Sequence, residues 1–324
     1  MRVRGAVSSS LLLVGLAIAS VGCNKNAVDA QKLAKQAQSI QGETPKDAIE
    51  QYKQASQLDP TNHEILSHLA LLQEKQKMWT DAADTWAKAA AADPEHGSDD
   101  FASYHFHRGY CFWQAALKEP GGLMSETGKG YLEKVKEPMQ KALQKDKNLA
   151  DAWYYLGKAQ EALDDEQSAL ESYTDAINTR PDQLPYYVDL ANLYLNLGYG
   201  GEGLAVATEG QKQKDNVKPK SDAERDEAYS ALYNLMIDEA RAAELLNKPD
   251  VKIAALEKTR SVPNPKNAAR EAEYQLALAY YQARRPNDAC SALLAYEKTP
   301  QGKDPQSAAN HTDATGKKAQ WGCK

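Results

Sequence analysis

The sequence lacks most of what a β-sheet protein needs. Only three phenylalanines occur among its 324 residues, and Trp, Tyr and Phe together make up 8%. Long runs of alternating Val, Ile and Thr, which are typical of strands, are missing. The mean hydropathy is −0.67. Ala, Leu, Gln, Glu and Lys are abundant instead, and these residues lose little rotamer freedom in a helix. The composition therefore predicts an all-α protein.

The sequence also lacks any cluster of basic residues. Its formal net charge is −6, and removal of the amino-terminal segment that contains Arg2 and Arg4 would leave −8. Nucleic acids and anionic membrane surfaces attract strongly basic faces. We therefore expect neither as a direct partner of the folded chain.

The amino terminus has the pattern of an export signal. The two arginines are followed by an apolar stretch, Leu11–Ala19, which is too short to span a bilayer. Gly22 directly before Cys23 resembles a bacterial lipobox, although Ser20 stands where that motif usually has Leu. The resemblance implies a signal peptide at residues 1–22, a lipid on Cys23 and a short tether at 23–27. Several acyl chains on one residue would anchor the chain stably in a membrane.

The same resemblance implies a place in the cell. The residue after Cys23 is Asn24, whereas Asp at that position often marks retention in the inner membrane of Gram-negative bacteria. We therefore expect an exported, lipid-anchored protein of the cell envelope, on the outer membrane and facing the periplasm.

An internal repeat dominates the rest of the chain. A small residue, an aromatic ring, an alanine and a proline recur with constant spacing, and the second copy begins 34 residues after the first. The copies are Ala48, Tyr52, Ala55 and Pro60, then Ala82, Trp86, Ala89 and Pro94, and later Ala169, Tyr173, Ala176 and Pro181. Trp153, Leu156, Gly157 and Gln160 precede the third of these copies.

This pattern resembles the tetratricopeptide repeat, in which two helices form a hairpin and small residues let them approach closely. The only departure in the best copy is Gln160, where that family has Tyr. The resemblance implies a right-handed superhelical solenoid of about seven hairpins over residues 28–300. One hairpin cannot cover its own apolar face, so neighbouring hairpins must stack. We expect an insertion at 119–130 and a polar tail at 301–324.

Several motifs could suggest catalysis or metal binding, but their spacing argues against it. His63 and His68 lie five residues apart, about 140° around a helix, so they cannot form the zinc-protease pair. His105 and His107 point to different sides of a helix. The glycines of Gly198–Gly203 lack the Gly-Lys-Ser/Thr of a phosphate loop and fit a turn. We therefore predict no enzyme activity, no metal and no cofactor.

Two groups of residues are candidates for partner binding. In tetratricopeptide repeats, ligands often lie in the groove lined by the first helices, and the resemblance places there Tyr154, Lys158, Glu161, Val188, Asn192 and Leu195. A second group is aromatic and falls within thirteen residues: Phe101, Tyr104, Phe106, Tyr110, Phe112 and Trp113. Aromatic residues often anchor interfaces, but burial beneath the neighbouring insertion explains this group better.

Three cysteines remain once Cys23 is assigned to lipid, and an exported chain can keep a disulfide. Cys290 lies in the last repeat and Cys323 in the tail, whereas Cys111 lies several hairpins away. A disulfide needs Cα atoms within about 7 Å, so we predict the Cys290–Cys323 pair and a partly buried free thiol at Cys111.

The most consistent function is a non-enzymatic scaffold that binds other envelope proteins or peptides during assembly, secretion or export. The alternative is a lipoprotein that associates with peptidoglycan or an exported polysaccharide through sugar stacking on Tyr and Trp. The fold alone cannot decide between them, because one scaffold serves many tasks.

Overall fold

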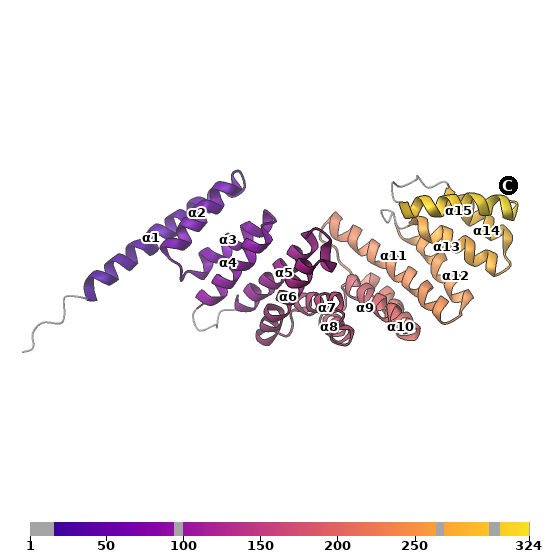
Figure 1. Ribbon diagram of the computed structural model, residues 1–324, viewed down its shortest axis with the longest axis horizontal. Coiled ribbons are helices and arrows are strands. Elements are labelled where there is room, and N and C mark those ends of the chain that lie inside the picture. Colours follow the sequence, from indigo (N-terminus) through magenta and orange to yellow (C-terminus); the bar gives the residue numbers. More distant parts are fainter. Residues whose placement is uncertain (1–15, 94–99, 264–268, 298–304, 324) are drawn as a thin grey trace, which may run out of the picture. The chain divides into compact units, whose positions relative to one another are not determined.

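The computed structural model describes residues 16–93, 100–263, 269–297 and 305–323, and these ranges contain helices and no strand. The chain divides into two compact units, Met1–Lys147 and Asn148–Lys324. Each unit is a series of antiparallel helical hairpins (Figure 1). The seven hairpins of the described ranges confirm the all-α repeat fold that the sequence predicts.

Unit 1 contains three hairpins. Their helices are α1 (Leu16–Ile40) with α2 (Pro45–Leu58), α3 (His63–Lys75) with α4 (Trp79–Ala92), and α5 (Phe101–Lys118) with α6 (Glu126–Lys145). A short 3-10 helix, η2 (Gly122–Met124), lies in the connection between α5 and α6.

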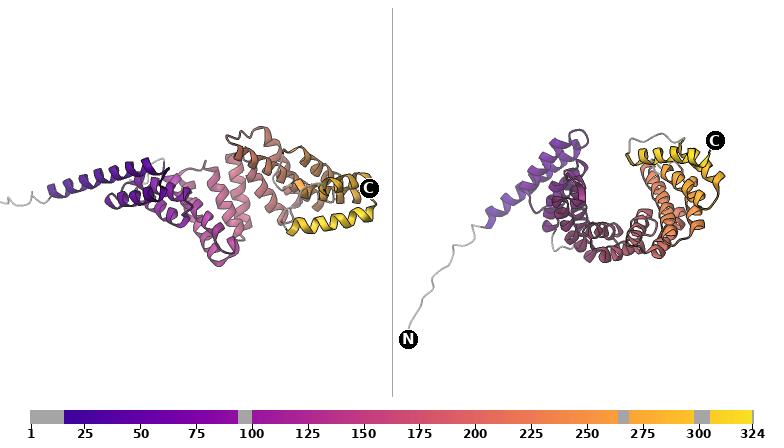
Figure 2. Two further views of the ribbon diagram at one scale, coloured as in Figure 1. Left: turned by 90° about the horizontal axis from the view of Figure 1, so that it is seen from above. Right: turned by 45° about the vertical axis from the view of Figure 1, so that its right-hand side comes forward.

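Unit 2 contains four hairpins and a final helix. The hairpins are α7 (Ala150–Ala162) with α8 (Glu166–Thr179), α9 (Leu184–Asn196) with α10 (Gly200–Lys212), α11 (Asp222–Leu245) with α12 (Pro249–Lys258), and α13 (Ala269–Gln282) with α14 (Pro286–Glu297). The short 3-10 helices η3 (Gln213–Asp215) and η4 (Thr259–Ser261) follow α10 and α12. The final helix, α15 (Pro305–Trp321), packs against α14 and α13 (Figures 1 and 2).

Local sequence determines where the helices begin and turn. The Asn62 side chain caps α3 by accepting a hydrogen bond from the Ile65 backbone N–H at 3.1 Å, and such caps satisfy donors that a helix start leaves free. In each of five hairpins, one residue of the turn between the two helices has a positive φ. These residues are Lys77, Asp164, Gly198, Asn247 and Arg284. Gly198 is therefore a turn residue, as its place between two helices predicts.

The repeat positions form the core of the hairpins. The paired alanines of the repeat are fully buried, and the ring between each pair is also buried. The rings are Tyr52, Trp86 and Tyr173. Two hydrogen bonds with the same spacing join the helices of a hairpin. Trp86 Nε1 donates to Glu74 Oε1, and the Tyr173 hydroxyl donates to Glu161 Oε2, both at 2.6 Å.

Glycine allows close packing at two positions. A Cβ atom on Gly157 would lie 2.9 Å from the Tyr173 ring. A Cβ atom on Gly210 would lie 2.7 Å from Tyr187. Gly203 and Gly210 disfavour a helix by their intrinsic propensity. The helix α10 nevertheless forms, and its glycines leave room for the side chains of the helices that pack on it.

Several expected boundaries differ from the structure. Helix α1 already begins at Leu16, so it includes residues 23–27, expected as a tether. The expected insertion at 119–130 is shorter, because α6 starts at Glu126. The expected tail at 301–324 contains the helix α15. Trp153, which precedes the third copy of the repeat, is half-buried.

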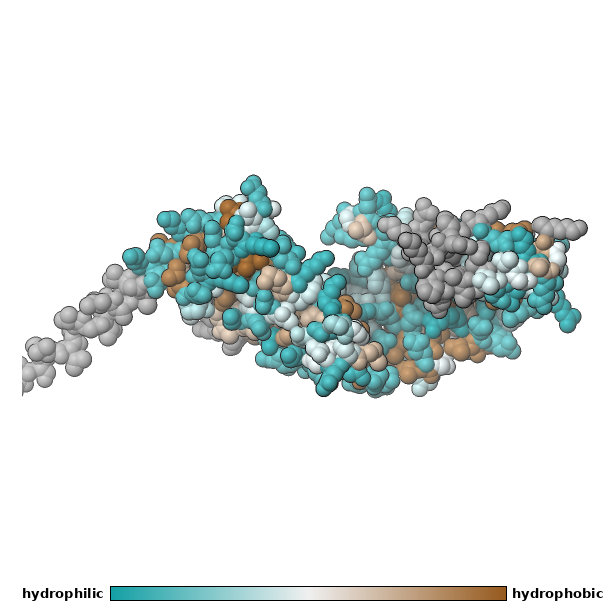
Figure 3. Space-filling model, turned by 45° about the horizontal axis from the view of Figure 1, so that its top comes forward, coloured by the Kyte–Doolittle hydropathy of each residue, from teal (hydrophilic) through white to brown (hydrophobic). Residues whose placement is uncertain are grey.

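Within the described ranges, no helix is both long enough and apolar enough to cross a membrane. Hydrophilic side chains predominate on the face shown in Figure 3. Most of the predicted signal peptide, residues 1–15, lies outside the described ranges.

Candidate functional site: a polar network on the first helices of unit 2

The first helices of three consecutive hairpins in unit 2, α7, α9 and α11, carry neighbouring polar side chains. One hydrogen-bonded group joins α7 to α9 and a second joins α9 to α11, and the charge of Asp189 acts on members of both. We call this set the first-helix network, and it consists of Tyr154, Lys158, Glu161, Asp189, Asn192, Asp238 and Arg241.

Asp189 on α9 joins α9 to α7. Its Oδ2 atom accepts hydrogen bonds from Lys158 Nζ at 2.6 Å and from the Tyr154 hydroxyl at 2.7 Å. The Lys158 and Asp189 side chains are each 25% exposed. Because the ion pair is partly shielded from water, its attraction is screened less than that of a surface pair.

Arg241 on α11 joins α11 to α9. Its guanidinium donates to Asn192 Oδ1 at 2.5 Å, to Asn196 Oδ1 at 3.2 Å and to Asp238 Oδ1 at 3.1 Å. The Asn192 amide in turn donates to Asp238 Oδ2 at 3.3 Å. The Asp238 side chain is only 3% exposed, whereas that of Arg241 is 40% exposed.

Burial changes the acidity of several groups in the network. Burial, with a smaller effect of the negative charge of Asp189, raises the pKa of Asp238 to about 6 against the opposing effect of the Arg241 guanidinium. Burial also raises the pKa of Glu161 and that of the Tyr154 hydroxyl. As the pH falls through about 6, the Asp238 carboxyl therefore takes up a proton, and the network loses one negative charge.

This geometry is suited to recognition. The described side chains of the network hold one another in fixed positions, so a partner would order few of them on binding. The Lys158 and Arg241 side chains are partly exposed, at 25% and 40%. The network therefore offers an ordered row of donors and acceptors to a polar ligand.

The structure brings together four of the six groove residues predicted from sequence. Tyr154, Lys158, Glu161 and Asn192 belong to the network. Val188 and Leu195 do not, because both are buried in hydrophobic packing. Sequence reasoning also missed three members, which are Asp189, Asp238 and Arg241. Asp238 and Arg241 form an i, i+3 acid–base pair that the predicted helix could have revealed, but the degenerate sixth repeat gave no frame for them.

Half of the aromatic group on α5 is buried, and Tyr104 packs on the preceding hairpin. Tyr104, Phe112 and Trp113 are buried, and Phe101, Phe106 and Tyr110 are partly buried. Tyr104 stacks on Trp86 with ring centroids 5.5 Å apart. The Tyr104 hydroxyl lies 2.8 Å from His63 Nδ1. The buried members of this group therefore stabilise unit 1, and Phe106 and Tyr110 stack on each other at its partly exposed side.

Glu74 is the centre of a second polar cluster, in unit 1. Its Oε1 atom accepts hydrogen bonds from Trp86 Nε1 at 2.6 Å and from Cys111 Sγ at 3.3 Å, and it lies 3.1 Å from His107 Nδ1. The thiol of Cys111 is fully buried, not partly buried as expected, and burial raises its pKa. A nucleophilic cysteine needs the opposite environment. The described residues also contain no group of three side chains suited to a metal ion.

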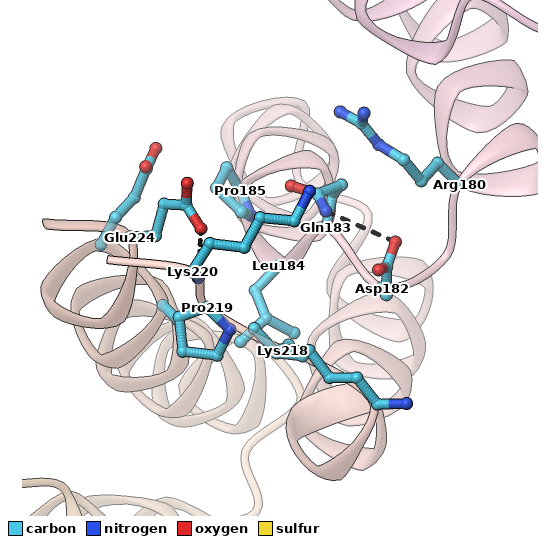
Figure 4. A pocket seen from close by; sticks show the side chains of 12 residues that line it. Arg180, Asp182, Gln183, Leu184, Pro185, Lys218, Pro219, Lys220 and Glu224 are labelled. Atoms are coloured by element: carbon cyan, nitrogen blue, oxygen red, sulfur yellow. Dashed lines mark hydrogen bonds between the residues drawn. The ribbon is translucent and has the colours of Figure 1, made fainter. Parts of the chain in front are cut away.

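A cavity of about 430 Å³ lies at the start of α9 (Figure 4). The segment before α11, with Lys218, Pro219 and Lys220, faces the turn that leads into α9. Asp182, Glu224 and Glu227 bring negative charge to the same cavity. Arg180 is already paired with Asp151 at 2.5 Å. The mixture of charges does not favour an ion of either sign.

Comparison with known proteins identifies the repeats. Residues 42–77 match the family model described as TPR repeat, and residues 151–182 match the model described as tetratricopeptide repeat. The chain therefore contains tetratricopeptide repeats in both units. The first segment spans α2 and α3, and the second spans the fourth hairpin, α7 with α8.

Solved structures show the same fold. The C-terminal part of a TPR repeat-containing protein from Cytophaga hutchinsonii superposes with a TM-score of 0.61 at 14% identity, covering 85% of this chain and 98% of that one. A tetratricopeptide repeat protein from Parabacteroides merdae gives a TM-score of 0.50 at 13% identity, covering 89% and 99%.

A curated relative is similar over part of the chain. The probable UDP-N-acetylglucosamine–peptide N-acetylglucosaminyltransferase SPINDLY of Hordeum vulgare is 26% identical over 184 residues. The match covers 56% of this chain but only 18% of that protein.

Proposed function

We propose that this tetratricopeptide-repeat chain is a binding scaffold that is lipid-anchored in the bacterial cell envelope and holds a polypeptide partner along the first-helix network. The observation that carries the proposal is the network itself, in which Lys158 and Arg241 are held in place yet remain partly exposed. Tetratricopeptide repeats mediate protein–protein interaction.

A polypeptide fits the network because its backbone and side chains offer both donors and acceptors. On α7, α9 and α11, the network presents Lys158 and Arg241 as donors and Glu161 and Asp189 as acceptors. Partners that bind through such ordered polar groups gain specificity, because mismatched groups would be left buried without hydrogen bonds.

The proposed anchor rests on the sequence of the amino terminus. The basic start, the short apolar stretch and Gly22 before Cys23 support export and lipidation. An anchor at Cys23 would place the repeats next to a membrane, where envelope assembly, secretion and export take place.

Crosslinking in intact cells tests the binding site. A photo-reactive amino acid would replace Asn196, which is exposed on α9 beside Arg241. The control position is Glu171, which is exposed on the second helix α8. We expect a discrete protein adduct from position 196 and none from position 171. The double variant Lys158→Gln, Arg241→Gln should reduce the yield at 196 at least tenfold while the helical circular dichroism stays unchanged. Equal adduct yields at positions 196 and 171 would contradict the proposed binding site. So would a yield at 196 that the double variant does not reduce.

Metabolic labelling tests the anchor separately. Wild-type chain should incorporate a clickable palmitate analogue and sediment with membranes, because acyl chains on Cys23 hold it there. The Cys23→Ser variant should lose the label, and Cys111→Ser should keep it. Labelling of the Cys23→Ser variant at the wild-type level would show that the lipid is attached to another residue.

A further inference from the structure

A pocket of about 320 Å³ lies in unit 1 between α1 and α3, the first helices of the first two hairpins. Its volume is at the lower end of the range of about 300–1,000 Å³ that is usual for small-molecule sites. The pocket is therefore large enough for a small polar ligand. The residues that line it are Gln31, Ala34, Lys35, Gln38, Tyr52, Asn62, Glu64, Ile65 and His68.

The hydroxyl of Tyr52 is the unpaired buried group of this pocket. Tyr52 is only 1% exposed, and within the described chain its hydroxyl makes no hydrogen bond. It is not one of the partnerless polar atoms that the protein encloses completely, so an oxygen atom in the pocket can touch it. Burial raises the pKa of the hydroxyl, which therefore keeps its proton and remains a donor. Because buried tyrosine hydroxyls usually have a partner, this one points to a ligand that supplies an acceptor.

The rings at the same repeat position in two other hairpins provide an internal comparison. Trp86 and Tyr173 each donate to a glutamate that precedes them by twelve residues. The residue twelve positions before Tyr52 is Ile40, whose side chain cannot accept a hydrogen bond. The second and fourth hairpins thus satisfy the ring donor internally, whereas the first hairpin leaves it to the pocket.

The imidazole of His68 lies against the Tyr52 ring. The two rings are stacked with an interplanar angle of 6° and centroids 6.1 Å apart. His68 Nδ1 lies 2.7 Å from the backbone carbonyl of Glu64, which can only accept, so Nδ1 carries a proton. In the neutral ring, Nε2 is then an acceptor. The two stacked rings therefore provide one donor and one acceptor whose positions are fixed.

The remaining polar groups of the pocket carry no net charge. Lys35 on α1 and Glu64 on α3 have opposite charges, and within the described part of the chain neither side chain makes an ion pair. Gln31 and Gln38 add carboxamides, and each carboxamide can both donate and accept. Interspersed donors and acceptors without net charge suit a neutral ligand with several hydroxyl groups, because each hydroxyl also donates and accepts.

We propose that this pocket binds a sugar ring of a glycan, with one sugar oxygen accepting a hydrogen bond from the Tyr52 hydroxyl and neighbouring hydroxyls pairing with Lys35 and Glu64. Ala34 and Ile65 supply the apolar lining against which the C–H groups of the ring would pack. The inference adds a carbohydrate ligand to the proposed scaffold. It does not depend on the partner at the first-helix network, since every residue that lines the pocket belongs to unit 1.

A free amino acid is the competing small ligand, because its carboxylate and ammonium could pair with Lys35 and Glu64. It has no further hydroxyls for the Tyr52 donor and for the carboxamides of α1. A sugar ring carries hydroxyls on several sides, so it can satisfy the charged and the uncharged groups together. The observations therefore favour the sugar.

Methyl NMR of the full chain, in micelles of a detergent without a sugar headgroup, tests the site. The Ile65 methyl reports on the pocket, and the Ile253 methyl, buried in unit 2, is the reference. The probes are N,N′-diacetylchitobiose for an N-acetylated glycan, maltotriose for a neutral polysaccharide, and glycine for a free amino acid. We expect a saturable shift at Ile65, and none at Ile253, with at least one of the two sugars. The sugar that binds more tightly identifies the kind of glycan.

A matched pair of variants separates binding from folding, because each removes one hydroxyl and keeps the ring. Tyr52→Phe removes an unpaired hydroxyl, so its melting temperature should equal or exceed that of wild type while sugar binding weakens at least fivefold. Tyr173→Phe removes the donor to Glu161, so its melting temperature should fall while sugar binding is kept.

Three results would overturn the proposal. The first is the absence of a saturable Ile65 shift with both sugars, which would mean that only water occupies the pocket. The second is binding of glycine at least as tight as that of the better sugar. The third is sugar binding that stays at the wild-type level in Tyr52→Phe.

Discussion

The Trp86→Ala variant is expected to lose about 3–5 kcal/mol of unfolding free energy, which is the usual cost of removing a buried tryptophan. Trp86 is 2% exposed. Its ring stacks on Tyr104 and on His107, with centroids 5.5 and 4.9 Å away. Its Nε1 atom donates to Glu74 at 2.6 Å. The substitution therefore opens a cavity and removes one donor from a partly buried carboxylate.

Hydrogen exchange and urea unfolding would measure this effect. In a repeat array, each hairpin contacts mainly its neighbours, so exchange should rise in α3 to α6 and change little in unit 2. Trp153→Ala is the matched control, because that ring is only half-buried, and its cost should be clearly smaller. An equal loss of unfolding free energy in the two variants would show that burial of Trp86 does not determine how much it stabilises the fold.

The Cys290→Ser, Cys323→Ser double variant is expected to lose about 3–4 kcal/mol in the last hairpin and α15, according to the chain-entropy estimate for a loop of this length. The two residues form a disulfide with Cα atoms 5.3 Å apart and a sequence separation of 33. This is the pairing that the sequence predicted, and Cys111 is the free cysteine of the described chain.

The contacts of α15 explain why the disulfide should matter. Among the described side chains of α15, only Ala314 is buried. Trp321 stacks on Tyr281 with centroids 4.2 Å apart, and Lys318 pairs with Glu297 at 2.7 Å. The Tyr274 hydroxyl also donates to Asp313. Gly316 weakens the helix by about 1 kcal/mol relative to alanine. The disulfide therefore adds a covalent attachment to a helix whose described side chains are mostly exposed or half-buried.

Limited trypsin digestion would measure the release of α15. Lys317 and Lys318 should become cleavable in the double variant, and in wild type treated with dithiothreitol, while unit 1 stays resistant. Cys111→Ser is the control for the loss of a thiol, and its tryptic cleavage pattern around α15 should match that of wild type. Resistance of α15 after complete reduction would show that non-covalent packing alone holds it.

The sequence by itself determined the fold, because the repeat is local. A spacing of three, four or seven residues places the small and aromatic positions on one face of a helix. The recurrence of Ala82, Trp86 and Ala89 after Ala48, Tyr52 and Ala55 then sets the hairpin frame. The Cys290–Cys323 pairing followed from the same frame, because it placed Cys111 several hairpins away.

Helix boundaries were less well determined. Two of the starts that differ from expectation have local signals, since the Ser125 hydroxyl caps α6 by accepting a hydrogen bond from the Gly128 backbone N–H and α15 begins at Pro305.

Only the tertiary structure decided which polar groups are paired. Lys158 meets Asp189, and Arg241 meets Asn192, on helices of different hairpins. Gln73 and Gln160 precede the aromatic rings of their hairpins by the same thirteen residues, yet the Gln160 carboxamide bonds to Ser172 whereas the Oε1 atom of Gln73 has no partner. A hydrogen bond requires donor and acceptor to lie within about 3 Å at a suitable angle. That geometry depends on how side chains from separate helices pack, and the spacing of residues along one helix does not contain it.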